Sequence, residues 1–173
     1  MRSTENRAHQ PAIQSVADVF FHFQTMLFLF RAPVQHGIQD DTAFAQARSV
    51  LIPLGEYFQV QDDFLDCYGE PAVIGKIGTD IEDNKCSWMI VQALRRATPG
   101  QRKVLDANYG CKDAERVAKV KQVYDDLNLR KVFAEFEEES YRRIGGLIAQ
   151  VDDAVVPREV FASFMKKIYK RTK

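Results

Sequence analysis

Three aspartates within five residues are the strongest candidates for chemistry in this 173-residue chain: Asp62, Asp63 and Asp66. On a helix, residues four apart share a face, so Asp62 and Asp66 would lie one turn apart on the same side. Carboxylates this close repel one another unless a hard cation sits among them. Because all these ligands are oxygens, the pattern favours magnesium over zinc. The alternative is a solvated acidic patch at a helix end.

A segment with glycines and lysines follows the aspartates. It contains Gly75, Lys76, Gly78, Asp80 and Lys85. Glycines let a loop approach an anion closely, and lysines attract phosphate groups. A site that combines a metal with lysines needs a polyanionic ligand such as a diphosphate to balance its positive charge. We therefore interpret the two segments as one site for a metal-bound diphosphate. The alternative is a glycine turn with surface lysines.

Helices must position these residues. From residue 15 onward the apolar spacing is helical, and no run alternates as a strand would, so we predict an all-α fold. We expect a loose tail over residues 1–14 and one domain over residues 15–173, because no linker divides the chain. The expected helices cover residues 16–30, 41–67, 84–96, 98–110, 113–127 and 129–150, with a last helix after Pro157 and a loop over residues 69–83.

The helix expected over residues 41–67 carries two rows of residues on different faces. One row has the spacing of a face that packs on a neighbouring helix. This row consists of Leu51, Leu54, Phe58, Gln61 and Leu65. The other row carries the aspartates and consists of Gly55, Gln59, Asp62 and Asp66. Pro53 lies within the helix and should bend it.

Composition and charge limit the classes of function. The 24 Lys and Arg residues balance the 24 Asp and Glu residues, so no net charge favours a nucleic acid as partner. Three widely spaced cysteines form no metal-binding pattern and indicate a reducing compartment. Residues 1–11 are polar, and the apolar run over residues 19–30 is too short to span a bilayer. We expect a soluble, cytoplasmic protein without a transmembrane segment.

Two further features have ordinary interpretations. Glu135, Glu137, Glu138 and Glu139 form an acidic run that we interpret as the solvated face of a helix, rather than a metal site. Tyr57 and Trp88 belong to a set of aromatic residues that core packing explains better than a wall for a bound chain does.

Two long motifs resemble one known family. LGEYFQVQDDFLD at residues 54–66 and GKIGTDIEDNKCSW at residues 75–88 are similar to the second aspartate-rich region of eukaryotic farnesyl diphosphate synthases, which are trans-prenyl diphosphate synthases. The ending IYKRTK, residues 168–173, is similar to their basic C-terminus. The resemblance runs from about Asp41 to Lys173, and DANYG at residues 106–110 resembles fungal members most.

The resemblance implies the C-terminal half of the isoprenoid-synthase helical bundle and a magnesium-dependent prenyltransferase. Such an enzyme condenses isopentenyl diphosphate with dimethylallyl or geranyl diphosphate to form farnesyl diphosphate, and full-length members are expected to be homodimers. The implied magnesium ligands are Asp62, Asp63, Asp66 and Asp80. The implied substrate contacts are Phe58, Gln59, Lys76, Lys85, Arg171 and Lys173. The implied catalytic residues are Lys76, Lys85 and Thr25.

The sequence also departs from the family pattern. The family's first aspartate motif is missing, and Asp40 and Asp41 read as a helix cap instead. Gln24 stands where a lysine would contact diphosphate, and the segment between Pro33 and Gly37 is shorter than in the family. Three origins fit these departures: an incomplete gene prediction, a truncated polypeptide, or a shortened paralogue. Such a paralogue would bind diphosphates or modulate an intact synthase without catalysis.

Overall fold

The computed structural model describes residues 41–75 and 77–172. All regular structure in these two ranges is helical, which confirms the all-α class. The expected tail over residues 1–14 and the helix expected over residues 16–30 lie outside the described residues. The helices are α2 (Asp41–Tyr68), α3 (Pro71–Ile74), α4 (Trp88–Arg96), α5 (Pro99–Asn108), α6 (Ala114–Asp126), α7 (Leu129–Gln150) and α8 (Arg158–Ile168).

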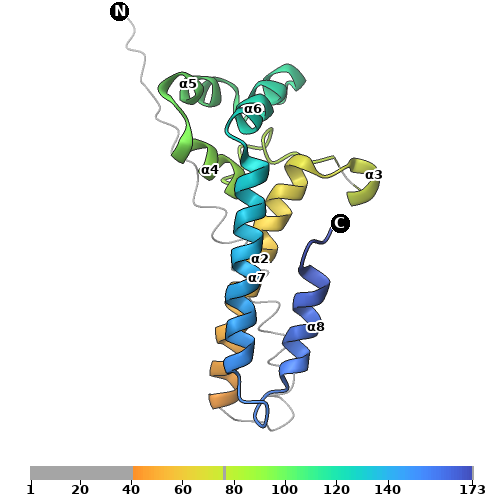
Figure 1. Cartoon of the computed structure of the whole chain (residues 1–173). Helices are drawn as coiled ribbons and strands as arrows, with labels where there is room; N and C mark the ends of the chain where they lie inside the picture. The colour runs from red at the N-terminus through yellow and green to blue at the C-terminus, as the bar shows by residue number, and fades with distance from the viewer. Residues whose placement is uncertain (1–40, 76, 173) are drawn as a thin grey trace, which may run out of the picture.

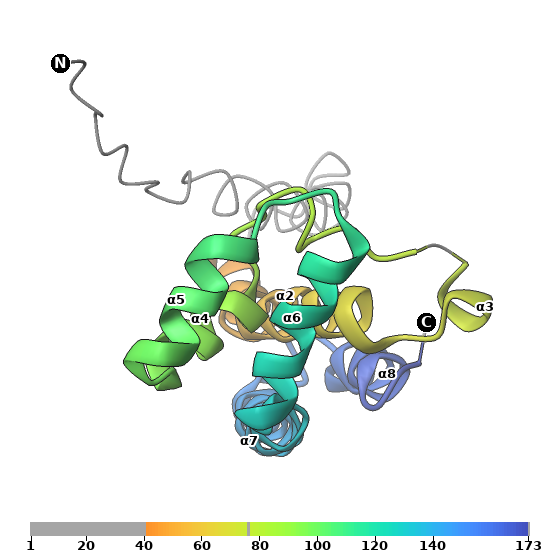
Figure 2. The ribbon, with the colours of Figure 1, turned by 90° about the horizontal axis from the view of Figure 1, so that it is seen from above.

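The two long helices, α2 and α7, run side by side, and α8 packs against both (Figure 1). Their shared core includes Leu54 of α2, Ile144 of α7 and Phe161 of α8, all fully buried. Seen from above, α4, α5 and α6 cross one end of this group (Figure 2). They enclose a second core around Met89 and Tyr124, which also takes in the end of α2. The first core therefore holds the earlier part of α2, and the second core holds the end that carries the aspartates.

The predicted packing row of α2 is largely confirmed. Leu51, Leu54 and Gln61 are buried, and Phe58 and Leu65 are partly buried. Tyr57 is also fully buried, which agrees with its interpretation as a core residue. Pro53 lies inside α2, and the helix continues past it.

Two helix boundaries differ from the prediction. The segment expected as a loop contains the single turn α3, which begins with Pro71 and is closed by Gly75 in the left-handed conformation (φ 77°). Helix α4 begins at Trp88 instead of Asn84, and Asn84 itself adopts a left-handed conformation (φ 56°) at the end of the preceding turn.

None of the described helices is long and apolar enough to cross a membrane. Cys67, Cys86 and Cys111 are free thiols. Burial raises the pKa of the Cys67 thiol to about 12, so this cysteine packs as an apolar residue.

Candidate functional site

The segment over residues 77–85 is seated on the aspartate end of α2. Gly78 passes so close to Asp66 that an added Cβ would lie 1.7 Å from the Asp66 carbonyl oxygen. Two residues on, the backbone N–H of Asp80 donates to Asp66 Oδ2 at 2.9 Å. The structure therefore brings together the two segments that were predicted to form one site, and the close approach requires glycine at position 78.

Lys85 links the two segments electrostatically. Its Nζ lies 2.9 Å from Asp63 Oδ1 and 2.9 Å from Asp80 Oδ2. Burial lowers the pKa of Lys85, but hydrogen bonds to Asp80 and Asp63 outweigh this effect and raise it above the usual range. Burial raises the pKa of Asp80 to about 6 despite Lys85, and the negative charge of Asp66 adds to the rise. The result is a partly buried cluster in which one ammonium group forms salt bridges with two carboxylates.

Asp63 connects this cluster to α4. Its side chain is buried, and Oδ2 accepts a hydrogen bond from the backbone N–H of Trp88 at 2.6 Å. Trp88 is the first residue of α4, so Asp63 satisfies a backbone donor that the helix itself leaves unpaired. The other oxygen accepts from Gln59 Nε2 at 3.2 Å as well as from Lys85. Both oxygens of Asp63 are therefore engaged within the protein.

Asp62 is paired with the C-terminal tail, residues 169–172. A terminal nitrogen of Arg171 donates to Asp62 Oδ1, and Arg171 Nε donates to Gln61 Oε1 at 3.1 Å. The guanidinium group also lies 3.8 Å from the centre of the Phe58 ring. The Arg171 side chain is only 15% exposed, against 39% for Asp62, so the tail is docked on α2 rather than extended into solvent.

The structure places most of the predicted site residues in one region. It brings together Phe58, Gln59, Asp62, Asp63, Asp66, Asp80, Lys85 and Arg171. Thr25, Lys76 and Lys173 lie outside the described residues. Within the described ranges, no three His, Cys, Asp or Glu side chains are arranged to hold a metal ion by themselves. The metal and substrate roles of these residues stay predictions.

One residue of the acidic run was assigned wrongly. Glu135, Glu138 and Glu139 are exposed as predicted, but Glu137 is buried. Glu137 Oε1 accepts from the Tyr57 hydroxyl at 2.9 Å and from Gln61 Nε2 at 3.0 Å. The sequence held a signal for this position, because Glu137 lies on the buried row of its own helix. That row is Leu129, Phe133, Glu137, Ser140 and Ile144.

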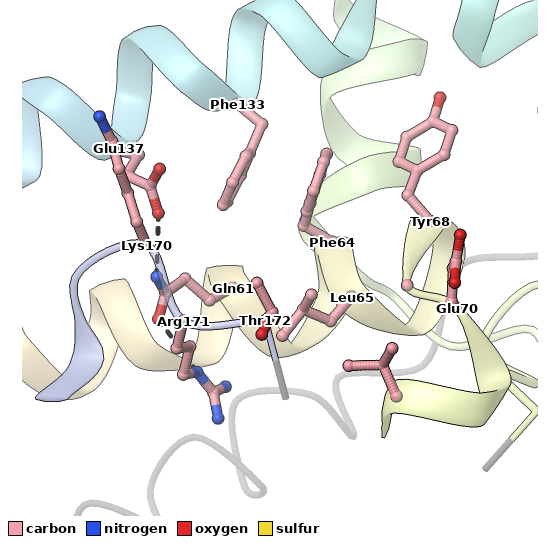
Figure 3. A pocket seen from close by; sticks show the side chains of 12 residues that line it. Gln61, Phe64, Leu65, Tyr68, Glu70, Phe133, Glu137, Lys170, Arg171 and Thr172 are labelled. Atoms are coloured by element: carbon pink, nitrogen blue, oxygen red, sulfur yellow. Dashed lines mark hydrogen bonds between the residues drawn. The ribbon is translucent and has the colours of Figure 1, made fainter. Parts of the chain in front are cut away.

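A cavity of about 420 Å³ opens beside the tail (Figure 3). Its apolar wall includes the stacked rings of Phe64 and Phe133, with centroids 3.8 Å apart and planes 7° from parallel. Lys170 and Arg171 of the tail line it from the other side. The complete lining is Gln61, Phe64, Leu65, Tyr68, Gly69, Glu70, Val73, Phe133, Glu137, Lys170, Arg171 and Thr172.

Comparison with known proteins identifies the family. The model of the polyprenyl synthetase family matches residues 20–127, which is more than half of the chain. The chain belongs to the polyprenyl synthetase family. A farnesyl pyrophosphate synthase from Ganoderma lucidum is 49% identical over 170 residues, covering 93% of this chain and 47% of the relative. The Rattus norvegicus enzyme of the same name is 48% identical over 156 residues, covering 87% of this chain and 44% of the relative.

Solved structures agree with this assignment. A T. brucei farnesyl diphosphate synthase complexed with risedronate superposes with a TM-score of 0.71 at 36% identity, covering 75% of this chain and 36% of that one. The same enzyme in complex with minodronate also superposes with a TM-score of 0.71. The described helices therefore have the helical fold of this polyprenyl synthetase. The chain spans about half the length of the curated relatives it matches.

Proposed function

We propose that this chain carries the second aspartate-rich half of a prenyltransferase site. The reaction is the condensation of isopentenyl diphosphate with dimethylallyl or geranyl diphosphate to form farnesyl diphosphate. The observation that carries the proposal is the seating of residues 77–85 on the aspartate end of α2, which gathers Asp63, Asp66, Asp80 and Lys85. The names of the relatives, farnesyl pyrophosphate synthases, supply the reaction.

The donor set fits magnesium when a substrate completes it. Asp62, Asp66 and Asp80 offer carboxylate oxygens, the ligands that this hard cation prefers. Because the described residues form no self-sufficient cluster of three ligands, oxygens of a bound diphosphate would have to supply the rest. The bound metal would neutralise charge on a departing diphosphate. The solved T. brucei complexes with bisphosphonates, ligands that carry two phosphonate groups, support this proposal.

The chain's own groups would assist in three ways. The ammonium of Lys85, held between two carboxylates, would stabilise negative charge that develops on the leaving diphosphate. The ring of Phe58, already covered by a guanidinium, would keep water from the reacting carbon. Arg171 would exchange its contact with Asp62 for one with a substrate phosphate, because both are charge-assisted hydrogen bonds. The proposal also includes a cytoplasmic location, which rests on the cysteine pattern, and a homodimeric state, which rests on the family resemblance.

Calorimetric titration of the 173-residue chain with risedronate tests the proposal. We expect binding that requires magnesium. The affinity should fall at least about tenfold in Asp62→Asn, because this substitution removes one charge-assisted interaction. Asp106→Asn removes an exposed carboxylate on α5 that pairs with Arg102, and should leave the affinity unchanged. Binding without magnesium, or equal affinity in Asp62→Asn and Asp106→Asn, would contradict the proposed site.

A further inference from the structure

The buried carboxylate of Glu137 lies at the centre of a hydrogen-bonded network between α2, α7 and α8. Its Oε1 accepts from the Tyr57 hydroxyl and from Gln61 Nε2. Tyr57 and Gln61 are 0% and 1% exposed, so neither donor has water as a substitute partner. Burial, reinforced by the hydrogen bond to Glu137, raises the pKa of Tyr57 far above its usual range and keeps its hydroxyl a donor. A buried network of this kind fixes the orientation of every member.

Gln61 transmits this fixed orientation to the tail. Its Nε2 lies within hydrogen-bond distance of three acceptors: the Tyr57 hydroxyl oxygen at 2.8 Å, Glu137 Oε1 at 3.0 Å, and the backbone carbonyl of Ile168, the last residue of α8, at 3.0 Å. With the amino group turned toward these acceptors, the amide oxygen faces the other way, where Arg171 Nε donates to it at 3.1 Å. Figure 3 shows the resulting sequence of contacts from Glu137 through Gln61 to Arg171.

We propose that Glu137 is a positioning residue that docks the basic C-terminal tail by orienting the side-chain amide of Gln61. Glu137 does not contact Arg171 directly in any hydrogen bond of the structure's described part. It acts through one side chain, and Arg171 in turn lies against both Asp62 and Phe58. The importance of this docking for catalysis rests on the proposed function, whereas the docking itself can be measured without any substrate.

Hydrogen exchange of the Arg171 Nε–H, followed by NMR on the full 173-residue chain, tests the inference. This hydrogen is the one donated to Gln61, and Arg171→Lys identifies its signal by removing it. Two substitutions separate the acceptor from the volume of the side chain. Glu137→Leu introduces an apolar side chain of similar size that has no acceptor, and Glu137→Gln keeps one acceptor oxygen. Glu135→Leu is the matched control, since the Glu135 side chain is 67% exposed on the same helix.

We expect Glu137→Leu to speed exchange at Arg171 by about tenfold or more, the effect of losing one buried hydrogen-bond acceptor. Glu137→Gln should stay within about threefold of the parent, and Glu135→Leu should match the parent. Equal acceleration of the backbone amides in the core of α2 would show a merely structural role and overturn the inference. The inference would also be overturned if the Arg171 Nε–H exchanged in Glu137→Leu at the parent rate, or in Glu137→Gln as fast as in Glu137→Leu. Glu137→Met carries the same expectation as Leu if the latter does not fold, because methionine adapts to irregular spaces.

Discussion

Replacing Gly78 with alanine should detach the loop of the candidate site from α2. The new Cβ would lie 1.7 Å from the carbonyl oxygen of Asp66 and 2.6 Å from its carbonyl carbon. Both atoms belong to the helix backbone, which cannot rotate away as a side chain would. The loop must therefore move, and the hydrogen bond from the Asp80 N–H to Asp66 Oδ2 is the first contact to break.

The expected loss of stability follows from the contacts involved. A hydrogen bond to a charged acceptor contributes about 1.5–3 kcal/mol. Forcing one extra carbon into a packed site costs about 1–3 kcal/mol. Alanine reduces the conformational entropy of the unfolded chain, which offsets about 0.4–1 kcal/mol of this loss of stability. We expect Gly78→Ala to lower the free energy of unfolding by about 2–5 kcal/mol, a large part of the stability of an ordinary domain.

Urea denaturation followed by circular dichroism measures this difference, and the same substitution elsewhere provides the control. Gly145 lies inside α7, and an added Cβ there meets no atom within 4 Å. Gly145→Ala should therefore raise the free energy of unfolding by about 0.5–1 kcal/mol through better helix propensity. Opposite signs for the two variants would support the reasoning. A Gly78→Ala variant within about 0.5 kcal/mol of the parent would refute it.

Three further predictions use the same denaturation assay. Burial raises the pKa of Asp80 to about 6, so between about pH 4 and 6 the folded chain holds a proton that the unfolded chain has released. The free energy of unfolding should therefore fall by up to about 3 kcal/mol as the pH rises through this window. Asp80→Asn should abolish that fall. Thr98→Ala removes the side chain that accepts from the Gln101 N–H at the start of α5 and should cost about 1 kcal/mol, whereas Thr98→Ser should cost less than half of that. Asp63→Leu leaves the first amide of α4 and the Lys85 ammonium without this carboxylate and should cost about 3–5 kcal/mol, clearly more than Asp63→Asn, which keeps one acceptor. An Asp63→Leu variant as stable as the parent would show that this carboxylate does not hold α4.

Local sequence signals predicted the helices well because they act over a few residues. Pro99 and Gly110 bound α5 and the turn after it almost where expected, and Asp113 caps α6 through the N–H groups of Glu115 and Arg116. The start of α4 was misplaced because its first amide is satisfied by Asp63, twenty-five residues earlier in the chain. Spacing and propensity carry no information on such a distant partner.

Burial of a charged residue is the harder prediction, and Glu137 shows why. Its acidic neighbours Glu135, Glu138 and Glu139 point to solvent, and an acidic run is usually solvated. The position of Glu137 on the buried row of α7 indicated burial instead. What decides between the two signals is the presence of donors on α2, which only the packing of two helices eighty residues apart supplies.

The contacts of the candidate site bear directly on how a ligand would enter it. Asp62 already pairs with Arg171, and Asp63 and Asp80 share Lys85. On the proposed function, a metal-bound diphosphate therefore exchanges one set of charged contacts for another, and its net affinity is the difference between two strong interactions. Arg171 is more buried than Asp62 and is held by Gln61. The strength of the tail's docking therefore determines how much free energy the ligand must overcome to separate Arg171 from Asp62. A residue remote from the aspartates, such as Glu137, can then alter ligand affinity without touching the ligand.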